Sequence, residues 1–281
     1  MEEKQYHYDP EEDFGLISDH FTEWADKTRA KNFVIGMSGG KDSTVVAMLL
    51  IKLFGRDRVV AVSIPNGSSE EKTDGEVISE ILGLKCMVVD IHDAFLSLLD
   101  MISYNKFNGK DIKVTNDCII NLPPRLRMSV LFAVGQCVDG RVVNTSNLSE
   151  DTVGYATQFG DNAGAYAPIQ DLTVSEVQQL GMYLAKELGI DEDVIRPWVF
   201  KVPADGLQEQ SDEDRLGFKY ADLDNLIRNN IGITEEFVDD IFKRYKRNKF
   251  KTDIVKMPKP VRPFNSKLPN FVKYPNDGYV H

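Results

Sequence analysis

A glycine-rich turn lies between an apolar run, residues 33–35, and a helical pattern that begins near Thr44. Small residues in such a turn let backbone N–H groups point inward, and the start of the following helix adds about half a positive charge. The turn also carries Lys41, a possible cation, and Asp42, a possible ligand for the magnesium that accompanies a triphosphate. These residue types predict a phosphate-binding loop for ATP. Its members are Gly36, Met37, Ser38, Gly39, Gly40, Lys41, Asp42 and Ser43.

The loop differs from the P-loop of nucleotide-hydrolysing proteins. That motif needs a glycine five positions before its Gly-Lys pair and a Ser or Thr directly after the pair. Here Ile35 and Asp42 occupy these two positions. The loop instead resembles the S-G-G-x-D-S loop of the ATP pyrophosphatases, which hold the β- and γ-phosphates as a leaving group while a substrate oxygen attacks the α-phosphorus. A glycine-rich turn without a ligand is the alternative, but the position directly after a buried strand favours the phosphate loop.

A second polar loop, residues 144–150, follows another apolar strand. Ligands of a parallel sheet bind beyond the carboxyl ends of its strands, so this loop and the loops after Ile35 and Ile64 should meet in one crevice. Glu150 could there join Asp42 in holding magnesium. The alternative is that Glu150 is an exposed carboxylate that caps a helix.

Hydrophobic periodicity predicts strands that alternate with helices along most of the chain. Such an order requires crossover connections, which produce a parallel sheet covered by helices. With 281 residues, of which 42% are hydrophobic, the chain can bury one large α/β core. We therefore expect a single doubly wound parallel sheet flanked by helices. The expected strands are residues 33–35, 58–64, 85–90 and 141–145, and the expected helices are residues 17–28, 44–54, 70–82, 94–104, 119–138 and one opened by a capping box at residues 173–176.

The net charge of −11 is unevenly distributed. Residues 243–281 contain 11 Lys and Arg against two Asp, whereas the preceding 242 residues carry a net charge of −20. An acidic surface of this extent would repel a nucleic-acid backbone, so no nucleic-acid partner is expected. Five prolines prevent the basic segment from forming one long helix. We divide the chain into a domain of residues 1–246 and a tail of residues 247–281 that closes over the site or a partner subunit, with a disordered tail as the alternative.

No segment reaches the length of a transmembrane helix, and the charged N-terminus lacks the apolar core of a signal peptide. We therefore expect a cytoplasmic protein without a membrane partner. Cys86, Cys118 and Cys137 lie in apolar stretches without the spacing of a metal or redox motif, so we expect reduced cysteines in the core. The acidic runs 191–193 and 212–214 are interpreted as solvated helix starts.

Several separated blocks resemble one family over nearly the whole chain, the ammonia-dependent NAD synthetases. The order and spacing of the blocks separate this family from other ATP pyrophosphatases, which share only the first loop. The blocks are residues 36–43 (GMSGGKDS), 125–128 (RLRM), 144–150 (NTSNLSE), 154–161 (GYATQFGD), 168–169 (PI), 201–207 (KVPADGL), 212–220 (DEDRLGFKY) and 248–251 (NKFK).

The resemblance implies an adenine-nucleotide alpha-hydrolase-like fold, a homodimer, and amidation of deamido-NAD with ammonia. In that reaction Mg²⁺ and ATP convert the carboxylate to a mixed anhydride with AMP, and the products are NAD, AMP and pyrophosphate. The implied ATP contacts are residues 36–43 and Thr145, and the implied magnesium ligands are Asp42 and Glu150. The implied deamido-NAD contacts are Arg125, Gln158, Asp161, Phe250 and Lys251. The implied catalytic residues are Asp42, Lys41 and Lys251.

Departures from the family pattern gather on the substrate side. The differing positions are Gln158 and Val174 in place of lysines, Ala165 in place of an aspartate, Phe250 in place of a histidine and Ala204 in place of a Ser or Thr. The changes at Gln158 and Ala165 remove one charge of each sign, which preserves the local balance but weakens recognition of the acid dinucleotide. Two alternatives therefore stay open: another adenylate-forming amide ligase of this fold, and a non-catalytic ATP-binding module.

The resemblance also bears on the source of nitrogen. A glutamine-using member needs a further domain with a nucleophilic cysteine, and all three cysteines here lie in the synthetase region without a paired histidine. Free ammonia, or ammonia delivered by a separate protein, is therefore expected. An enzyme that thiolates transfer RNA would share the first loop, but it needs catalytic cysteines and a basic face.

Overall fold

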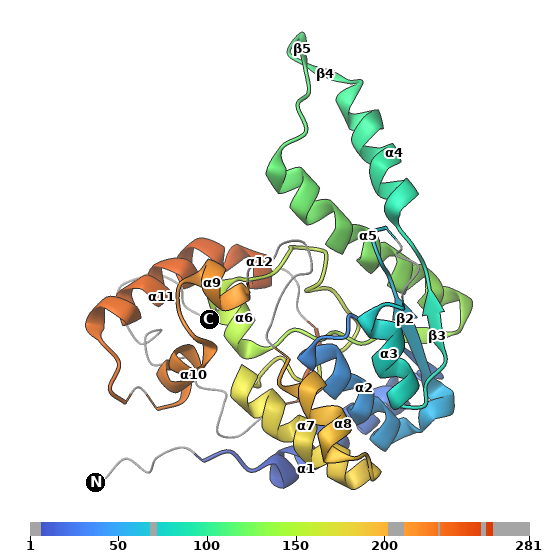
Figure 1. Ribbon diagram of the computed structural model, residues 1–281, viewed down its shortest axis with the longest axis vertical. Helices are drawn as coiled ribbons and strands as arrows, with labels where there is room; N and C mark the ends of the chain where they lie inside the picture. The colour runs from blue at the N-terminus through green and yellow to red at the C-terminus, as the bar shows by residue number, and fades with distance from the viewer. Residues whose placement is uncertain (1–6, 68–71, 202–210, 230, 254–256, 261–281) are drawn as a thin grey trace.

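The computed structural model describes residues 7–67, 72–201, 211–229, 231–253 and 257–260. Its centre is a four-stranded parallel sheet in the order β3-β2-β1-β6 (Figure 1). Phe33 of β1 pairs with Val59 of β2 and with Arg141 of β6, so these two strands flank β1. The sheet therefore has the parallel topology that the alternation of elements predicts. Its strands are β1 (Asn32–Gly36), β2 (Val59–Ser63), β3 (Cys86–Val88) and β6 (Gly140–Val142), and the 3-10 turn η1 (Arg56–Arg58) precedes β2.

Helices cover both faces of the sheet. Successive side chains of a strand point to opposite faces, and both faces here carry apolar side chains that must be buried. Phe33 and Ile35 belong to the larger hydrophobic core, whereas Val34 between them belongs to a second core on the other face. This arrangement confirms the doubly wound architecture. The helices of the larger core are α1 (Pro10–Lys27), α2 (Lys41–Phe54), α3 (Asp74–Ile81), α7 (Val174–Leu188) and α8 (Glu192–Val199), and α5 (Asn116–Cys137) covers the second.

Polar caps, rather than apolar periodicity, set where several helices begin. The helix expected from residue 70 begins at Asp74, because Thr73 forms a capping box with the third residue of α3. Asp9 and Thr115 cap α1 and α5, so both helices begin earlier than the apolar pattern predicts. The capping box predicted at residues 173–176 is present at the start of α7.

An arm of two helices projects from the body (Figure 1). It contains α4 (His92–Ser103), the antiparallel strands β4 (Lys106–Phe107) and β5 (Lys110–Asp111), and the first part of α5. Apolar side chains on this arm are largely exposed, with Tyr104 at 82% and Phe107 at 72%. A cluster of exposed apolar groups is typical of a surface that another protein covers. The members of this apolar arm surface are Leu96, Met101, Tyr104, Phe107, Ile119 and Ile120.

A smaller helical layer packs against α6 (Leu148–Val153). Asn248 in this layer donates from Nδ2 to the Val153 carbonyl at 2.8 Å, and the Ala167 N–H donates to the Pro258 carbonyl at 3.0 Å. The boundary drawn after residue 246 falls inside α11, so the division into residues 1–246 and 247–281 stays a prediction. The helices of the layer are α9 (Asp212–Leu216), α10 (Tyr220–Arg228), α11 (Glu235–Asn248) and α12 (Phe250–Asp253).

Two sequence interpretations are wrong in part. Cys86 is half-buried on the edge strand β3 and packs against the larger core, but Cys118 and Cys137, at the two ends of α5, are half-buried and exposed and belong to no described core cluster. Asp212 is not solvated, since it is 6% exposed and accepts a hydrogen bond from the Tyr155 hydroxyl at 2.9 Å. Within the described residues, no helix combines the length and apolar character needed to cross a membrane.

Candidate active site

The glycine-rich loop joins the carboxyl end of β1 to the first turn of α2, as predicted. The Ser38 Oγ accepts a hydrogen bond from the Gly40 N–H at 3.1 Å and lies 3.0 Å from the Ser43 Oγ, which holds the loop in a closed turn. Gly40 is the N-cap of α2, and because it has no side chain it leaves the front of the helix open to an anion. Gly39 has a φ of +76°, and a Cβ there would overlap Asp74, so only glycine fits.

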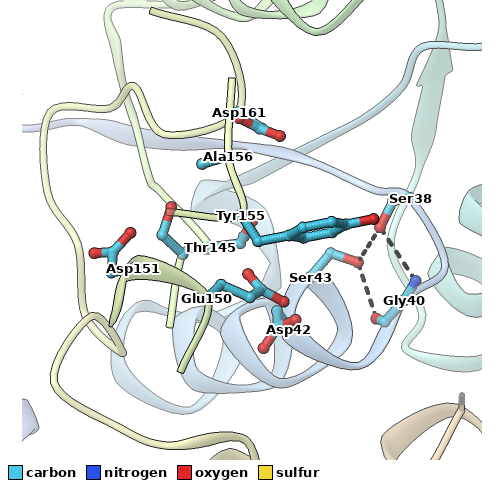
Figure 2. A pocket seen from close by; sticks show the side chains of 11 residues that line it. Ser38, Gly40, Asp42, Ser43, Thr145, Glu150, Asp151, Tyr155, Ala156 and Asp161 are labelled. Carbon is cyan, nitrogen blue, oxygen red and sulfur yellow. Dashed lines mark hydrogen bonds between the residues drawn. The ribbon is translucent and has the colours of Figure 1, made fainter. Parts of the chain in front are cut away.

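This loop lines one wall of a cavity of about 110 Å³ (Figure 2). The other walls are the loop after β6 with the start of α6, and residues 155–161. The loops after β1 and β6 therefore meet in one crevice, as the sequence predicts. The loop after β2, which is expected to join them, contributes none of its described residues to the cavity lining. The residues proposed for ATP that line the cavity are Ser38, Gly40, Asp42, Ser43 and Thr145. Gly36, Met37, Gly39 and Lys41 do not line it, and Met37 packs in the larger core.

The cavity wall is acidic. In the part of the chain that the structure describes, its lining contains four carboxylates and no lysine, arginine or histidine. Burial raises the pKa of Asp151 to about 6, and the buried Asp151 Oδ1 has no hydrogen-bond partner among the described residues. A buried oxygen of this kind at a cavity can accept a hydrogen bond from a bound molecule. The sequence analysis did not single out Ser146, Asp151, Tyr155 or Ala156, although each lies within six residues of Glu150.

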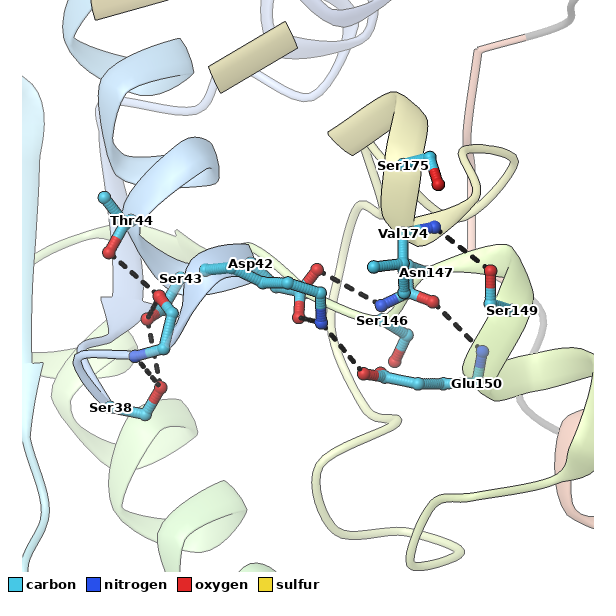
Figure 3. A network of polar contacts seen from close by, with 12 residues as sticks. Ser38, Asp42, Ser43, Thr44, Ser146, Asn147, Ser149, Glu150, Val174 and Ser175 are labelled. Carbon is cyan, nitrogen blue, oxygen red and sulfur yellow. Dashed lines mark hydrogen bonds and ion pairs between the residues drawn. The ribbon is translucent and has the colours of Figure 1, made fainter. Parts of the chain in front are cut away.

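Asp42 and Glu150 extend from α2 and α6 toward the same gap (Figure 3). Asn147, the N-cap of α6, orders both: its Nδ2 donates to the Asp42 Oδ1 at 3.1 Å, and its Oδ1 accepts from the Glu150 N–H at 3.0 Å. The Lys41 Nζ lies between the carboxylates, 2.7 Å from the Asp42 Oδ2 and 3.4 Å from the Glu150 Oε1. The Lys41 side chain is 3% exposed, so this cation pairs with the carboxylates behind the cavity wall.

The charges of this trio depend on one another. Burial works against the Lys41 charge, but Asp42 and Glu150 outweigh it and raise the pKa of the ammonium. Burial raises the pKa of Glu150, an effect that Lys41 opposes and Asp42 reinforces. The three side chains are thus held together by ion pairs that are largely shielded from solvent.

The carboxylate pair fits a magnesium ion that arrives with a nucleotide. Mg²⁺ prefers oxygen ligands and is usually held by one or two carboxylates together with substrate phosphates. Asp42 and Glu150 supply such a pair, whereas no cluster of three or more His, Cys, Asp or Glu in the described ranges could hold a metal without help. The alternative role of Glu150 as a helix-capping carboxylate is not observed. Asn147 caps α6 by accepting a hydrogen bond from the Glu150 N–H, and the Glu150 carboxylate faces Lys41.

Residues implied for the dinucleotide gather beside the cavity. The Arg125 Nε donates to the Gln158 carbonyl at 3.2 Å, and the Gln158 Nε2 donates to the Phe250 carbonyl at 3.4 Å. The Phe250 side chain is 55% exposed, so its ring is free to stack on a ligand. Three segments that lie far apart in the sequence are thus joined at one place.

Lys251 completes this cluster from the tail. Its Nζ donates to the carbonyls of Gly154 and Ala156 at 2.9 and 3.1 Å, and burial lowers the pKa of the ammonium. Asp161 lines the cavity and accepts from the Thr157 N–H at 2.7 Å. The tail lysine therefore lies against the loop that forms one cavity wall.

Two of the positions that differ from the family pattern, Val174 and Ala165, have structural roles. Val174 is 5% exposed, and its N–H donates to the Ser149 Oγ at 3.0 Å, so its side chain packs in the core and does not line the cavity. The Ala165 N–H donates to the Val142 carbonyl at 2.8 Å, which extends the pairing of β6. Ala204 lies outside the described residues.

Comparisons with known proteins identify relatives over most of this chain. A sequence model of the family described as NAD synthase matches residues 16–256. An NH(3)-dependent NAD(+) synthetase of Carboxydothermus hydrogenoformans is 32% identical over 238 residues, which are 83% of this chain and 92% of that protein. One from Pyrococcus furiosus is 29% identical over 85% of this chain and 92% of its own length. A glutamine-dependent NAD(+) synthetase of Thermotoga maritima is 28% identical, and the match spans 47% of its length.

Solved structures show the same relationship. The structure of an NMN synthetase from Francisella tularensis superposes with a TM-score of 0.74 at 26% identity and covers 90% of this chain and 99% of its own. An NH3-dependent NAD synthetase from Campylobacter jejuni gives a TM-score of 0.66 at 25% identity, with 91% and 100% covered. The match to the family extends over both walls of the cavity and the described start of the tail, and on this ground the chain belongs to the NAD synthase family.

Proposed function

We propose that this protein is a ligase that joins ammonia to the carboxylate of deamido-NAD at the expense of ATP, with NAD, AMP and pyrophosphate as products. One observation carries the proposal. The glycine-rich loop and the carboxylate pair Asp42–Glu150 meet at one cavity, in a chain of the NAD synthase family. A binding module without catalysis would not need this pair of carboxylates at its phosphate loop.

The proposed chemistry has two steps, because a carboxylate has no good leaving group of its own. In the first, a carboxylate oxygen attacks the α-phosphorus of ATP, the bond to the bridging oxygen breaks, and pyrophosphate leaves. In the second, ammonia attacks the carbonyl carbon of the mixed anhydride, AMP leaves, and the nitrogen gives up a proton. The main tasks of the protein are to position the reactants and to offset negative charge.

The proposed roles follow the walls of the cavity. The glycine-rich loop and the start of α2 would hold the β- and γ-phosphates, and Thr145 would contact the nucleotide. Asp42 and Glu150 would hold Mg²⁺, which when bound supplies positive charge to the phosphate oxygens. The deamido-NAD side would be formed by Arg125, Gln158, Asp161, Phe250 and Lys251.

A second candidate substrate is the acid form of NMN, the mononucleotide. It is favoured by the structural likeness to the NMN synthetase from Francisella tularensis, which superposes over 90% of this chain. The chemistry at the carboxylate would be identical, and only the adenylate half of the substrate would be missing. The ratio of kcat/KM for deamido-NAD and for nicotinic acid mononucleotide decides between them, and a ratio above 1 favours the dinucleotide.

Three further features belong to this proposal. Ammonia is the proposed nitrogen donor, in line with the names of the relatives that this chain matches over most of their length. A homodimer is proposed because a second copy would cover the apolar arm surface. A cytoplasmic location is also proposed, and cell fractionation tests it.

One incubation tests the reaction. Purified protein is mixed with Mg²⁺, ATP, ammonium chloride and deamido-NAD, each component is omitted in turn, and both AMP and NAD are measured. Equal amounts of AMP and NAD that require every component support the proposal. ATP binding without AMP formation for either nicotinate substrate contradicts it.

A further inference from the structure

The Lys41 ammonium lies between Asp42 and Glu150, at the position where a metal ion held by these two carboxylates would bind. Its Nζ is 2.7 Å from the Asp42 Oδ2 and 3.4 Å from the Glu150 Oε1, and its side chain is 3% exposed. The Tyr220 ring of α10 covers the ammonium, with the ring centroid 5.8 Å from Nζ. The other Asp42 oxygen is fixed by the Asn147 amide. The Lys41 ammonium is thus held in a buried position by both carboxylates and the Tyr220 ring.

A lysine ammonium and a divalent ion cannot share these oxygens. Mg²⁺ binds its oxygen ligands at about 2.1 Å, and an ammonium that stays within hydrogen-bond distance of the same carboxylates would face it at close range. The two positive charges would repel each other strongly in a site that solvent reaches poorly. Occupation by one therefore weakens the binding of the other.

The Lys41 ammonium, once displaced, can move toward the cavity. Lys41 is the first residue of α2, directly after Gly40 of the cavity wall, and its flexible stem can carry the ammonium to the front of the helix. Among the described residues, the cavity lining contains no basic side chain that would repel the ammonium at the front of the helix. A triphosphate is a strong partner, because it brings several negative charges to the loop that adjoins Lys41.

We propose that Lys41 occupies the cation position of the nucleotide-free protein and thereby couples the binding of Mg²⁺ to the binding of ATP. A metal ion that binds alone must displace the ammonium from its carboxylate partners. When ATP binds together with the metal, its phosphates become the new partner of the displaced ammonium. Coupling of this kind is reciprocal, so metal must also strengthen nucleotide binding through Lys41. This inference rests on the proposed function only in assigning Asp42 and Glu150 to the metal.

The test measures Mn²⁺ binding by electron paramagnetic resonance, which detects the free ion and needs no catalysis. Wild-type protein is compared with Lys41→Gln, and Lys52→Gln is the matched control, because Lys52 pairs with Glu187 near the other end of α2. We expect Lys41→Gln to bind Mn²⁺ without nucleotide at least about tenfold more tightly. Lys52→Gln should equal the wild type. Equal Mn²⁺ affinity in Lys41→Gln and wild type overturns the proposal.

A second measurement addresses coupling. The affinity for an ATP analogue with a methylene group between the α- and β-phosphates is measured with and without Mn²⁺. The solution affinity of Mn²⁺ for the analogue is the same for both proteins and cancels when the two ratios are compared. The enhancement by Mn²⁺ should be at least about tenfold smaller in Lys41→Gln than in the wild type. An unchanged enhancement contradicts the role of Lys41.

Wild-type protein alone also tests the idea, should Lys41→Gln fold poorly. Mg²⁺ without nucleotide should leave the Tm almost unchanged, and Mg²⁺ with the analogue should raise it clearly. A rise with Mg²⁺ alone as large as that with both overturns the proposal. The omission assay for AMP is separate, so a wild type that forms AMP while failing these tests would refute Lys41 coupling and leave the proposed reaction standing.

Discussion

Replacing Asp42 by asparagine should weaken both the fold and the reaction. The Asp42 Oδ2 lies 2.7 Å from the Lys41 ammonium, and the two side chains are 16% and 3% exposed. Removal of one partner from a buried ion pair costs about 3–5 kcal/mol, because the other charge is left uncompensated. Glu150 stays 3.4 Å from the ammonium and retains part of the pairing. We therefore expect a loss of roughly 2–4 kcal/mol for Asp42→Asn, less than the full cost.

Thermal unfolding without nucleotide measures this loss. For a protein of this size, 1 kcal/mol corresponds to about 2–4 °C in Tm, so Asp42→Asn should unfold roughly 4–16 °C below the wild type. Glu187→Gln is the matched control, because Glu187 pairs at 3.0 Å with Lys52 of the same helix, where both side chains are more than a quarter exposed. Exposed pairs contribute about 0–1 kcal/mol, so this variant should stay within a few degrees of the wild type.

The same variant tests the metal assignment. AMP formation by Asp42→Asn, assayed below its Tm, should fall by about a hundredfold or more, because charge on the phosphates is no longer offset. Asp42 lies in the first turn of α2 and not in an open loop, so its replacement affects the fold as well as the reaction. A Tm equal to that of Glu187→Gln would refute the buried pairing, and near-normal AMP formation would refute the role in metal binding.

Three other predictions use different parts of the chain. Gly75→Ala should lower stability by about 1–3 kcal/mol, since a Cβ would overlap the Met37 carbonyl oxygen, whereas Gly15→Ala in α1 has free space and should be neutral or stabilising by up to about 1 kcal/mol; urea unfolding compares them. Phe107→Ser should weaken the proposed dimer in sedimentation experiments, and a wild type that stays monomeric at tens of micromolar contradicts the dimer. Lys251→Met should lower kcat/KM about a hundredfold with little change in Tm, and unchanged kinetics would remove Lys251 from the site.

The sequence predicts the place of the site well, because that place depends on local signals. A buried run that ends in small residues fixes the carboxyl end of β1, and a polar segment after another buried run fixes that of β6. Parallel strands bring both ends to one edge, so the meeting of Ser38 and Glu150 at one cavity follows from topology alone. Gly39 is likewise predictable from the sequence, because the turn into α2 places it at a φ of +76°, which favours glycine.

The sequence does not predict which partner a long side chain chooses. Lys41 directly follows a phosphate loop, and every local signal directs its charge forward, yet its ammonium turns back to Glu150, 109 residues away. That choice depends on the depth of the pocket and on the Tyr220 ring from α10, which closes over it. The pairing of Lys251 with two backbone carbonyls is equally invisible, because main-chain acceptors have no sequence signature.

The acidity of the cavity gives mobile cations a role. Within the described ranges, four carboxylates line the wall, and a triphosphate adds several more negative charges, so this lining by itself disfavours the proposed nucleotide. The partial charge at the start of α2 is about half a unit and cannot balance them. Under the proposals above, Mg²⁺ that enters with the nucleotide and Lys41 released from behind the wall add positive charge to that of Lys251 beside the cavity. A site arranged in this way would bind the metal–nucleotide complex far better than either component, which makes the dependence of ATP binding on divalent cation the property most directly set by its geometry.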